Sequence, residues 1–425
     1  MTVERPASAL RPTIAIVGSG PSGCYTAQFL RKDLPEAEIT VFEALPVPYG
    51  LVRYGVAADH QGTKAVAAQF DRMFSRSNVT FVGNTRVGAD VDVAAILESF
   101  DVVVAATGLT ADRGLPIPQQ TGAHIVGAGQ VLRHLNAYPE AAPPSTPPMK
   151  ALGRDIIVVG HGNVAIDVVR LLTKRARHFA GSDVHDAALA AMRPTAPSTV
   201  HVIGRSSVDN AKFDLAMLRE LVALETVSVA ADGVDAAASG PVADLLRATA
   251  DRADQQDTPP GAEVTTVRFH FQTVPAAVRV ENGRTVLDAT GPCGPVSLTA
   301  DTVVTAIGFC HDDTVEHAVA HSAWTAPHVY RVGWFERGGR GNIAENRKHA
   351  QQTAKSIVAD LREGRLACGR RPGLAAVRGA LPATVDFAGW QAIDAAERRA
   401  ADDQRCRRKI TDLEEMVSIG RAAAR

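Results

Sequence analysis

Two glycine-rich motifs carry the clearest chemical signal in this sequence. One is the GxGxxG of residues 18–23, and the other is the GxGxxA of residues 160–165. In such a motif the first glycine permits a tight turn, the second lets a pyrophosphate approach the backbone, and the small third residue lets a helix pack closely on a strand. The free N–H groups at the start of that helix attract an anion. A glycine turn that serves only packing is the alternative, so the flanking elements decide between the two.

Each motif lies between a predicted strand and a predicted helix. The strands are the short apolar segments 13–17 and 155–159, and apolar residues at helical spacing follow each motif. About 20 residues after the first motif, the predicted strand 38–42 ends at Glu43, where a carboxylate would meet a ribose hydroxyl. Strand, glycine turn, helix, strand and terminal acid together indicate a bound dinucleotide.

The elements that follow the second motif differ from those that follow the first. Its partner strand, residues 198–204, comes about 40 residues later, and we attribute the excess to an inserted helical segment, 183–192. That strand ends in Arg205 and Ser206 rather than in an acid. An arginine at this position suits the 2′-phosphate of NADP, so NADP is favoured over NAD. A surface arginine at a strand end is the alternative.

Composition excludes several classes of function. With 425 residues and a formal net charge of −1, the chain is long enough for about two or three domains and has no overall field that favours nucleic acid or anionic membranes. No apolar segment reaches the roughly 20 residues of a membrane span, and the N-terminus has no signal-peptide core. The five cysteines form no C-x-x-C, which argues against a redox disulfide, an iron–sulfur cluster or a metal site. We therefore expect a cytoplasmic protein with reduced thiols, a monomer or weak dimer.

Other segments can approach a ligand closely. The predicted strands 100–108 and 301–308 end in small residues, Thr107 and Gly108 in the first of them, and a glycine-dense loop covers 332–345. For the rest of the chain we expect an ordered loop over 46–60, helices over 61–74, 214–222 and 346–361, short strands over 79–82 and 86–93, a loose surface excursion over 232–262, β structure over 263–304, and a charged helical stretch with a solvated face over 388–418.

These elements predict an α/β fold with two Rossmann-like dinucleotide-binding domains, the second inserted into the first. We place the first domain at 1–110 and 311–425, and the inserted domain at 111–310. Two dinucleotides in one chain suggest a nicotinamide and a flavin, because the first donates a hydride and the second can accept it and release electrons singly. FAD is assigned to the first motif and NADP(H) to the second.

Four segments, in their order along the chain, resemble sequence motifs of the adrenodoxin reductase-type ferredoxin–NADP reductase family. These segments are 46–60 (PVPYGLVRYGVAADH), 160–167 (GHGNVAID), the loop at Trp334, and 389–397 (GWQAIDAAE), and the match runs in order from about residue 12 to about residue 418. The resemblance implies an FAD domain interrupted by an NADP domain. It also implies electron flow from NADPH through FAD to a ferredoxin-like iron–sulfur protein.

The resemblance also assigns site residues. His60 and Glu220 are expected near the flavin–nicotinamide junction as polar or proton-relaying groups. Together with the motif residues, the expected cofactor contacts are Gly18, Gly20, Ser22, Gly23, Glu43, Gly50, Leu51, Val87, Thr107, Gly108, Trp334, Gly341, Asn342 and Ile343 for FAD, and Gly160, His161, Gly162, Asn163, Val164, Arg205, Ser206 and again Gly341 for NADP.

The sequence departs from the family pattern mainly on the nicotinamide side. Ser206 stands where a second arginine is usual, Met217 where a glutamate is usual, Glu336 where a lysine is usual, and Gly339 where a proline is usual. These changes leave the choice between NADPH and NADH open. One alternative is a flavoenzyme of the same fold recruited to small-molecule oxidation or reduction, and another is a non-catalytic flavin-binding protein.

Basic residues near the end of the second motif's helix suggest a partner surface. Arg170, Lys174, Arg175 and Arg177 could dock an acidic ferredoxin, or they could form a charged and exposed helix end. The sequence alone leaves both readings open.

Overall fold

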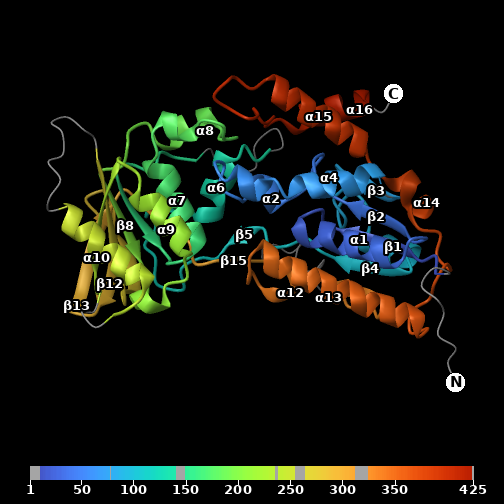
Figure 1. Ribbon diagram of the computed structural model, residues 1–425, viewed down its shortest axis with the longest axis horizontal. Coiled ribbons are helices and arrows are strands. Elements are labelled where there is room, and N and C mark those ends of the chain that lie inside the picture. The colour runs from blue at the N-terminus through green and yellow to red at the C-terminus, as the bar shows by residue number, and fades with distance from the viewer. Residues whose placement is uncertain are drawn as a thin grey trace. The chain divides into compact units, whose positions relative to one another are not determined.

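A computed structural model describes residues 10–76, 78–139, 149–234, 238–253, 264–311 and 324–423. The structure is α/β with two separate parallel sheets, which confirms the predicted fold class (Figure 1). The chain divides into two compact units. Unit 1 consists of Met1–Ala111, Ala137–Ser145 and Phe309–Arg425, and unit 2 consists of Asp112–Asn136 and Thr146–Gly308.

Unit 1 is built on a five-stranded parallel sheet whose strand order is β16-β4-β1-β2-β3. Helices α1 and α13 cover one face of this sheet, and α5 and α14 cover the other. The pleat of β1 sends Ile14 and Ile16 to the first face, and Ala15 and Val17 to the second. The bounds are β1 Thr13–Val17, β2 Glu38–Phe42, β3 Val79–Val82, β4 Val102–Ala105, β16 Val329–Arg331, α1 Pro21–Asp33, α5 Val93–Ser99, α13 Ile343–Arg362 and α14 Leu374–Val377.

Unit 2 is built on a six-stranded parallel sheet whose order is β6-β14-β7-β8-β10-β9. A three-stranded antiparallel sheet, β11-β12-β13, packs Val278 and Leu287 against Ile157 and Ile203 of the parallel sheet. The bounds are β6 Ile125–Gly127, β7 Asp155–Val159, β8 Thr199–Ile203, β9 Val227–Asp232, β10 Thr265–His270, β11 Val274–Glu281, β12 Arg284–Gly291, β13 Gly294–Ala300 and β14 Thr302–Thr305.

Both sheets have a switch point at the strand that precedes a glycine motif. Strand β1 pairs with β2 on one side and β4 on the other, and β7 pairs with β8 and β14 in the same way. At such a point the connections leave in opposite directions, and a crevice forms beyond the carboxyl ends of the strands. Each glycine motif begins at this end of its sheet.

Each of the other helices belongs to one of the two units. Helix α7, which follows the second motif, packs on α9 in unit 2. The remaining bounds are α2 Leu51–Tyr54, α3 Gln61–Lys64, α4 Ala67–Arg76, α6 Ala128–Leu135, α7 Asn163–Thr173, α8 Asp186–Met192, α9 Leu215–Val222, α10 Pro241–Ala253, α12 Trp334–Arg337, α15 Phe387–Arg399 and α16 Leu413–Ala422, with two short strands, β5 Ala111–Asp112 and β15 Phe309–Cys310, that pair with each other.

The segment 86–93, expected as a strand, forms a turn instead. The Asp90 carboxylate accepts the N–H of Arg86 at 2.7 Å, and Gly88 adopts a φ of 97°. A local side-chain hydrogen bond has therefore overridden the β pattern.

Helices also occur in segments that were expected to lack them. The excursion at 232–262 contains α10, which begins at Pro241, a residue suited to the first helical turn. The loop at 46–60 contains α2, which follows Tyr49 and Gly50 at positive φ values of 85° and 46°. The helix expected over 61–74 is divided into α3 and α4.

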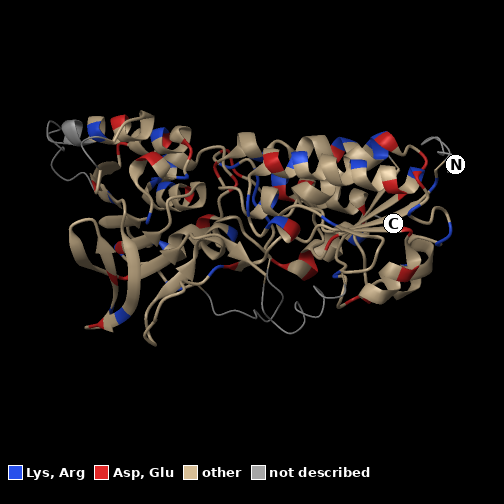
Figure 2. Ribbon diagram, turned by 90° about the horizontal axis from the view of Figure 1, so that it is seen from below, with Lys and Arg blue, Asp and Glu red and all other residues tan. Residues whose placement is uncertain are grey.

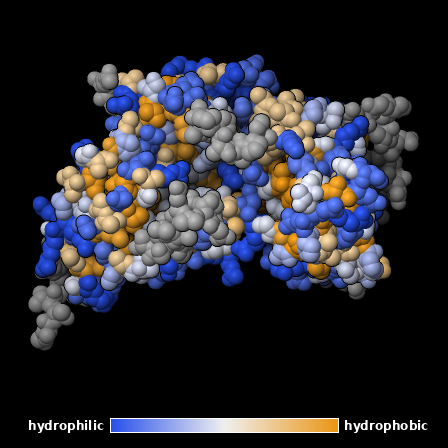
Figure 3. All heavy atoms as spheres, turned by 180° about the vertical axis from the view of Figure 1, so that it is seen from behind, coloured by the Kyte–Doolittle hydropathy of each residue, from blue (hydrophilic) through white to orange (hydrophobic). Residues whose placement is uncertain are grey.

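The described surface is mixed in charge and polarity. Figure 2 shows lysines and arginines interspersed with acidic residues along the helices, and Figure 3 shows apolar residues among polar ones on the face seen there. Within the described residues, no helix is long and apolar enough to cross a membrane. The same residues contain no group of three or more His, Cys, Asp or Glu side chains arranged to hold a metal ion.

Candidate functional site

The first glycine motif makes a tight turn against the end of a neighbouring strand in unit 1. Gly18 has a φ of 106°, and a Cβ atom built there would lie 2.5 Å from the carbonyl oxygen of Ala106. The Gly18 N–H donates to the Phe42 carbonyl, and the Ala106 N–H donates to the Val17 carbonyl, both at 2.8 Å. Only glycine fits at this position.

The second motif repeats this arrangement in unit 2. Gly160 has a φ of 139°, and a Cβ atom there would lie 2.3 Å from the carbonyl oxygen of Ala306. The Gly160 N–H donates to the Ile203 carbonyl, and the Ala306 N–H donates to the Val159 carbonyl, both at 2.8 Å. The two units thus build the same cradle at the switch points of their sheets.

The middle glycine of each motif faces open space. A Cβ atom at Gly20 or Gly162 would meet no described atom within 4 Å. Each of these glycines is the N-cap of a helix, α1 or α7, and no side chain caps the helix there. An uncapped helix N-terminus beside a residue without a side chain fits the phosphates of a dinucleotide. The residues present therefore fit the group that the motifs predict, in both units.

The third motif position sets how closely each helix packs. A Cβ atom at Gly23 would lie 2.0 Å from the Gly18 carbonyl oxygen, so α1 requires glycine there. Ala165 keeps its methyl group, fully buried, at the equivalent position of α7. The difference between the GxGxxG and GxGxxA motifs thus has a packing cause.

Glu43 holds the first motif in shape. Its carboxylate oxygen Oε2 accepts hydrogen bonds from the Ser19 N–H at 3.0 Å and the Ser19 hydroxyl at 2.5 Å. The other oxygen, Oε1, accepts the Leu45 N–H at 3.2 Å. Ser19 is fully buried, so the conformation of the loop depends on this acid as well as on its glycines. Sequence reasoning assigned Glu43 only to a ribose and missed this role.

The segment 46–60 runs against the first motif. A Cβ atom at Gly50 would lie 3.2 Å from the Cα atom of Gly20, and the Tyr49 N–H donates to the Ser19 carbonyl at 3.2 Å. Leu51 then begins α2. Gly50 and Leu51 therefore lie at the wall of the first cradle, and Tyr49 reaches this position only through a φ that is rare for residues other than glycine.

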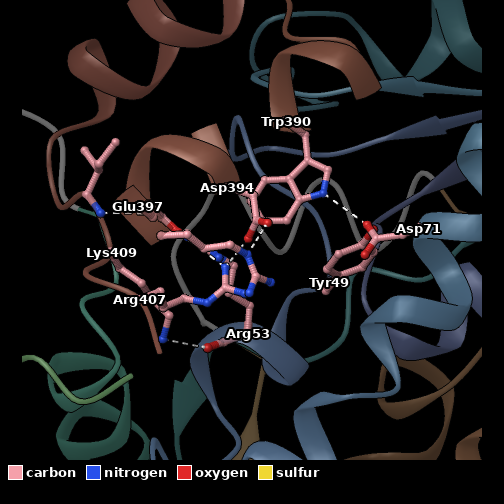
Figure 4. Close-up of polar contacts among 10 residues, drawn as sticks. Tyr49, Arg53, Asp71, Trp390, Asp394, Glu397, Arg407 and Lys409 are labelled. Carbon is pink, nitrogen blue, oxygen red and sulfur yellow. Dashed lines mark hydrogen bonds and ion pairs between the residues drawn. The ribbon is translucent and has the colours of Figure 1, made fainter. Parts of the chain in front are cut away.

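Tyr49 is anchored by a helix far away in the sequence. Its hydroxyl donates to Asp71 Oδ1 at 2.5 Å, and the Trp390 indole of α15 donates to the same oxygen at 3.3 Å (Figure 4). The Tyr49 and Trp390 rings meet edge to face, 5.8 Å between centroids. Burial, and then Asp71, raises the pKa of the Tyr49 hydroxyl well above its usual value. The hydroxyl thus stays protonated and continues to donate.

An ion pair joins α2 to α15 beside this contact. Arg53 Nη2 lies 2.5 and 2.7 Å from the two carboxylate oxygens of Glu397, and both side chains are buried (Figure 4). Glu397 Oε1 also accepts the Ile410 N–H at 3.1 Å, and the Arg53 carbonyl accepts from Lys409 Nζ at 3.3 Å. The prediction of a solvated charged face over 388–418 is therefore wrong at Glu397.

The glycine-dense loop reaches the N-terminus of α1. Gly333 has a φ of 71°, and a Cβ atom there would lie 2.0 Å from Ser22 Oγ. Trp334 follows, and its indole N–H donates to the Gly341 carbonyl at 2.9 Å. The Trp334 ring stacks on Phe309 with 5.3 Å between centroids. Ser22, Trp334 and Gly341 are thus brought together on one side of the first cradle.

The other residues assigned to the FAD side have separate roles in the fold. Asn342 caps α13: its side chain accepts the Glu345 N–H at 3.0 Å, and Ile343 begins the helix. Thr107 is exposed and follows the end of β4, as does Gly108 with a φ of 70°. Val87 lies in the turn at 86–93 and packs against the core on the α5 face of the sheet.

In unit 2 the His161 ring is buried in the core. Its Nε2 lies 3.2 Å from the Val202 carbonyl oxygen, and its ring centroid is 4.7 Å from that of Phe271. Burial lowers the pKa of His161 to about 4. A contact with a dinucleotide would therefore come from its backbone. Asn163 at the start of α7 accepts the Asp214 N–H at 2.7 Å, and Val164 is half-buried beside it.

Arg205 lies just beyond the end of β8. It is exposed and forms no ion pair with any residue that the structure describes. Gly204 before it lies against the motif, because a Cβ atom there would be 2.3 Å from His161 Nδ1. Ser206 is half-buried, and its carbonyl accepts the Gln272 N–H at 3.0 Å.

Lys212 also lies beside the second motif, and sequence reasoning did not single it out. Its N–H donates to the His161 carbonyl at 2.9 Å, and it forms an isolated parallel bridge with Gly162. Its side chain is exposed. A lysine seven residues after Arg205 carries no recognised spacing, so only the tertiary structure reveals this neighbourhood.

The two residues expected at the flavin–nicotinamide junction belong to different units. His60 in unit 1 is half-buried at the N-cap of α3, and its N–H donates to the Ala57 carbonyl at 2.9 Å. Glu220 in unit 2 is exposed on α9, with one carboxylate oxygen 3.5 Å from Nε of Arg170. Each residue is thus held by contacts within its own unit.

The basic residues after the second motif do not form one surface. Arg170 is completely buried and pairs with Asp167 at 2.8 Å. Arg177 is exposed and pairs with Glu225, while Lys174 and Arg175 are half-buried. Arg170 is therefore excluded from the docking surface that the sequence suggested.

Comparison with known proteins places this geometry in a family. Residues 12–206 match the family described as pyridine nucleotide-disulphide oxidoreductase. Cindoxin reductase of Citrobacter braakii is 41% identical, over 97% of this chain and 92% of its own length. The human mitochondrial NADPH:adrenodoxin oxidoreductase is 30% identical, over 96% of this chain and 92% of its own. The chain belongs to the adrenodoxin reductase family.

A solved structure of this family has the same fold. FprA of Mycobacterium tuberculosis, in complex with NADPH, superposes with a TM-score of 0.81 at 30% identity, covering 96% of this chain and all of its own. The NADPH-ferredoxin reductase FprA of the same organism is 34% identical in a full-length comparison. This protein is thus an oxidoreductase of the adrenodoxin reductase family.

Two departures from the family pattern have structural consequences. Gly339 adopts a φ of 78°, which proline cannot reach because its ring holds φ near −65°. The loop before Gly341 therefore follows a backbone path that a proline at 339 would exclude. Glu336 pairs with Arg331 at 2.7 Å, so the altered charge is balanced within unit 1.

Proposed function

We propose that this protein is an FAD-dependent NAD(P)H oxidoreductase that passes electrons from NADPH through FAD to a ferredoxin-like iron–sulfur carrier. The observation that carries this proposal is the repetition of one cradle, with Gly18 against Ala106 in unit 1 and Gly160 against Ala306 in unit 2. A chain with two such cradles can hold a hydride donor and a hydride acceptor at the same time.

Unit 1 would hold FAD. Its phosphates would meet the uncapped N-terminus of α1 at Gly20, with Gly50 on one side and the Ser22, Trp334 and Gly341 group on another. When bound, FAD supplies an acceptor for two electrons that can leave one at a time. The chain itself positions the cofactor. Glu43 fixes the conformation of the first motif, and the buried contacts of Tyr49 fix the adjoining segment at Gly50.

Unit 2 would hold NADP(H). Its phosphates would meet the N-terminus of α7 at Gly162, and the exposed Arg205 would face the 2′-phosphate. We assign His60 and Glu220 as polar groups near the reacting rings. Hydride transfer requires no general base, so we expect either residue to change the rate only modestly when replaced by glutamine.

The electron carrier is proposed from the relatives' names and from flavin chemistry. The relatives are named for three carriers, ferredoxin, adrenodoxin and cindoxin. A small carrier that takes one electron at a time agrees with the release of single electrons from a flavin. We therefore propose the iron–sulfur ferredoxin type and include cindoxin as a competing substrate in the test.

The test mixes the FAD-loaded protein with NADPH and with NADH under anaerobic conditions and follows flavin bleaching. Cytochrome c reduction is then measured with and without an added ferredoxin or cindoxin. The proposal expects bleaching by a nicotinamide and cytochrome reduction that requires ferredoxin. If cytochrome c is reduced only when cindoxin is added, cindoxin replaces ferredoxin as the proposed carrier. Slow bleaching by both nicotinamides, with fast bleaching by an organic substrate, would favour the small-molecule flavoenzyme instead.

A further inference from the structure

We propose that Lys212 supplies the second positive charge that binds the 2′-phosphate of NADP(H), complementing Arg205 in a chain that has a serine at position 206. This inference rests on the proposed function, because it takes the cradle of unit 2 to be the NADP(H) site. It assigns a coenzyme-selecting role to a residue outside the glycine motif and outside the strand end.

Lys212 is held beside the motif by its backbone. Its N–H donates to the His161 carbonyl at 2.9 Å, and it bridges Gly162, where an added Cβ atom would meet no described atom within 4 Å. Two residues later, the Asp214 N–H donates to the Asn163 side chain at 2.7 Å. The segment around Lys212 is therefore tied at two points to the loop that would carry the pyrophosphate.

Arg205 directly follows Gly204, a residue that packs on His161 of the motif. Gly204 packs so closely on His161 that a Cβ atom would lie 2.3 Å from the ring nitrogen Nδ1. Arg205 is thus one residue from a contact with the side chain of His161, and Lys212 bonds to the carbonyl of His161. Adjacent Cα atoms are about 3.8 Å apart, so both basic residues begin close to the same part of the loop.

The charges around the second motif favour a shared anion. A phosphate monoester carries about −1.5 to −2 at pH 7, which one guanidinium does not balance. Ser206 can donate a hydrogen bond but brings no charge. Among the described residues, neither Arg205 nor Lys212 is engaged in an ion pair, and the Asp214 carboxylate caps α9 by accepting the Ala216 N–H at 3.0 Å. Lysine binds phosphate well as a point charge.

The experiment measures binding without turnover, by titration calorimetry on the FAD-loaded protein. The probes are 2′,5′-ADP, which carries the 2′-phosphate, and 5′-AMP, which lacks it. Lys212→Ala should weaken 2′,5′-ADP by about tenfold, the effect of losing one charged hydrogen bond, and change 5′-AMP by less than about twofold. Lys212→Arg should restore most of the binding of 2′,5′-ADP, because it restores the charge.

A matched control separates local charge from net charge. Lys355 is exposed on α13 in unit 1, and Lys355→Ala removes the same charge from a different unit of the chain. It should leave both dissociation constants unchanged, and thermal melting should show that all variants are folded. An unchanged 2′,5′-ADP affinity in Lys212→Ala would overturn the inference, as would an equal loss for both probes. If the unmodified protein binds neither probe, the failure belongs to the proposed NADP(H) cradle rather than to Lys212.

Discussion

Arg53 and Glu397 form a buried ion pair, 2.5 Å at its shorter contact, although 344 residues separate them in the chain. Arg53 belongs to α2, which begins directly after Gly50 at the wall of the first cradle. Glu397 belongs to α15 near the C-terminus. A buried charge that loses its partner is strongly destabilising. The wall of the N-terminal cradle therefore depends on a helix at the other end of the sequence.

Replacing Glu397 should destabilise unit 1 and loosen its cofactor. Glu397→Gln leaves the Arg53 guanidinium buried without a counter-charge, so we expect a loss of about 3 kcal/mol or more in unfolding free energy and a lower FAD content. Urea unfolding followed by tryptophan fluorescence measures this directly, because Trp324, Trp334 and Trp390 all lie in unit 1.

Arg398, which is exposed and pairs with the half-buried Asp394 on the same helix, provides the control for this change. Arg398→Ala should cost less than about 1 kcal/mol, as is usual for surface ion pairs, and should leave the FAD content unchanged. Equal effects from the two substitutions would contradict the role given to Glu397.

Alanine at the first and second glycines of the first motif should differ in its effect on stability. Gly20→Ala adds a methyl group where no described atom lies within 4 Å, at a φ of −63° that alanine adopts easily. That variant should fold normally but lose FAD affinity by at least about tenfold, because the methyl occupies the place of a phosphate. Gly18→Ala, with a φ of 106° and a contact of 2.5 Å, should lower the melting temperature as well.

Melting temperature measured on the FAD-free forms, together with FAD titration, distinguishes the two variants. A Gly20→Ala protein that binds FAD as tightly as the unmodified chain would refute the placement of the phosphates. Gly162→Ala offers the parallel test in unit 2, with NADP⁺ as the ligand.

Local segments of the fold could be predicted from the sequence. The strand, turn and helix at 13–33 and at 155–173 are specified within a short stretch, because a buried strand, a positive φ at the first glycine and a close helix contact all act on neighbouring residues. The same holds for the glycine-dense loop before α13, whose Asn342 cap lies three residues from its Glu345 partner. These constraints need no knowledge of the rest of the chain.

The contacts that hold the cradles together could not be predicted in this way. Glu397 looked like part of a solvated face, although its spacing from Trp390 and Ile393 places it on the buried side of α15, a signal that charge alone obscured. Lys212 became relevant only because the chain folds back on His161. Such roles follow from tertiary packing between distant segments, and the periodicity of apolar residues in the sequence does not predict them.

The indole N–H of Trp334 should contribute to FAD retention through the loop it closes. Trp334→Phe keeps the stacking on Phe309 but removes the 2.9 Å hydrogen bond to the Gly341 carbonyl. A net loss of about 1 kcal/mol corresponds to FAD binding weakened by about fivefold, measured by fluorescence titration of the apoprotein.

Trp324 is the matched control for this substitution. It is buried in unit 1, on the α5 side of the sheet, and Trp324→Phe should alter stability without altering FAD affinity. Equal weakening of FAD binding by both substitutions would show that the loss comes from general destabilisation of unit 1 and not from the Trp334 hydrogen bond.

Acid should destabilise unit 2 through two of its histidines. Burial lowers the pKa of His161 from its usual 6.5 to about 4, and burial beside His270 lowers the pKa of His201 to about 4 as well. Between pH 6.5 and pH 4 these histidines bind protons in the unfolded chain but not in the folded one. Their contribution to the free energy of unfolding is therefore fully present above about pH 6.5 and is lost as the pH falls toward 4. For His161 alone the loss approaches about 3 kcal/mol.

Urea unfolding at pH 7.5, 6 and 5 tests this expectation. Far-UV circular dichroism is the appropriate signal, because unit 2 contains none of the three tryptophans. The His161→Gln variant has no imidazole to protonate, so its stability should depend less steeply on pH in this range, whatever its stability at pH 7.5. If the unmodified protein and His161→Gln lose stability in parallel between pH 6.5 and 5, the acid sensitivity arises elsewhere and the buried neutral state assigned to His161 is wrong.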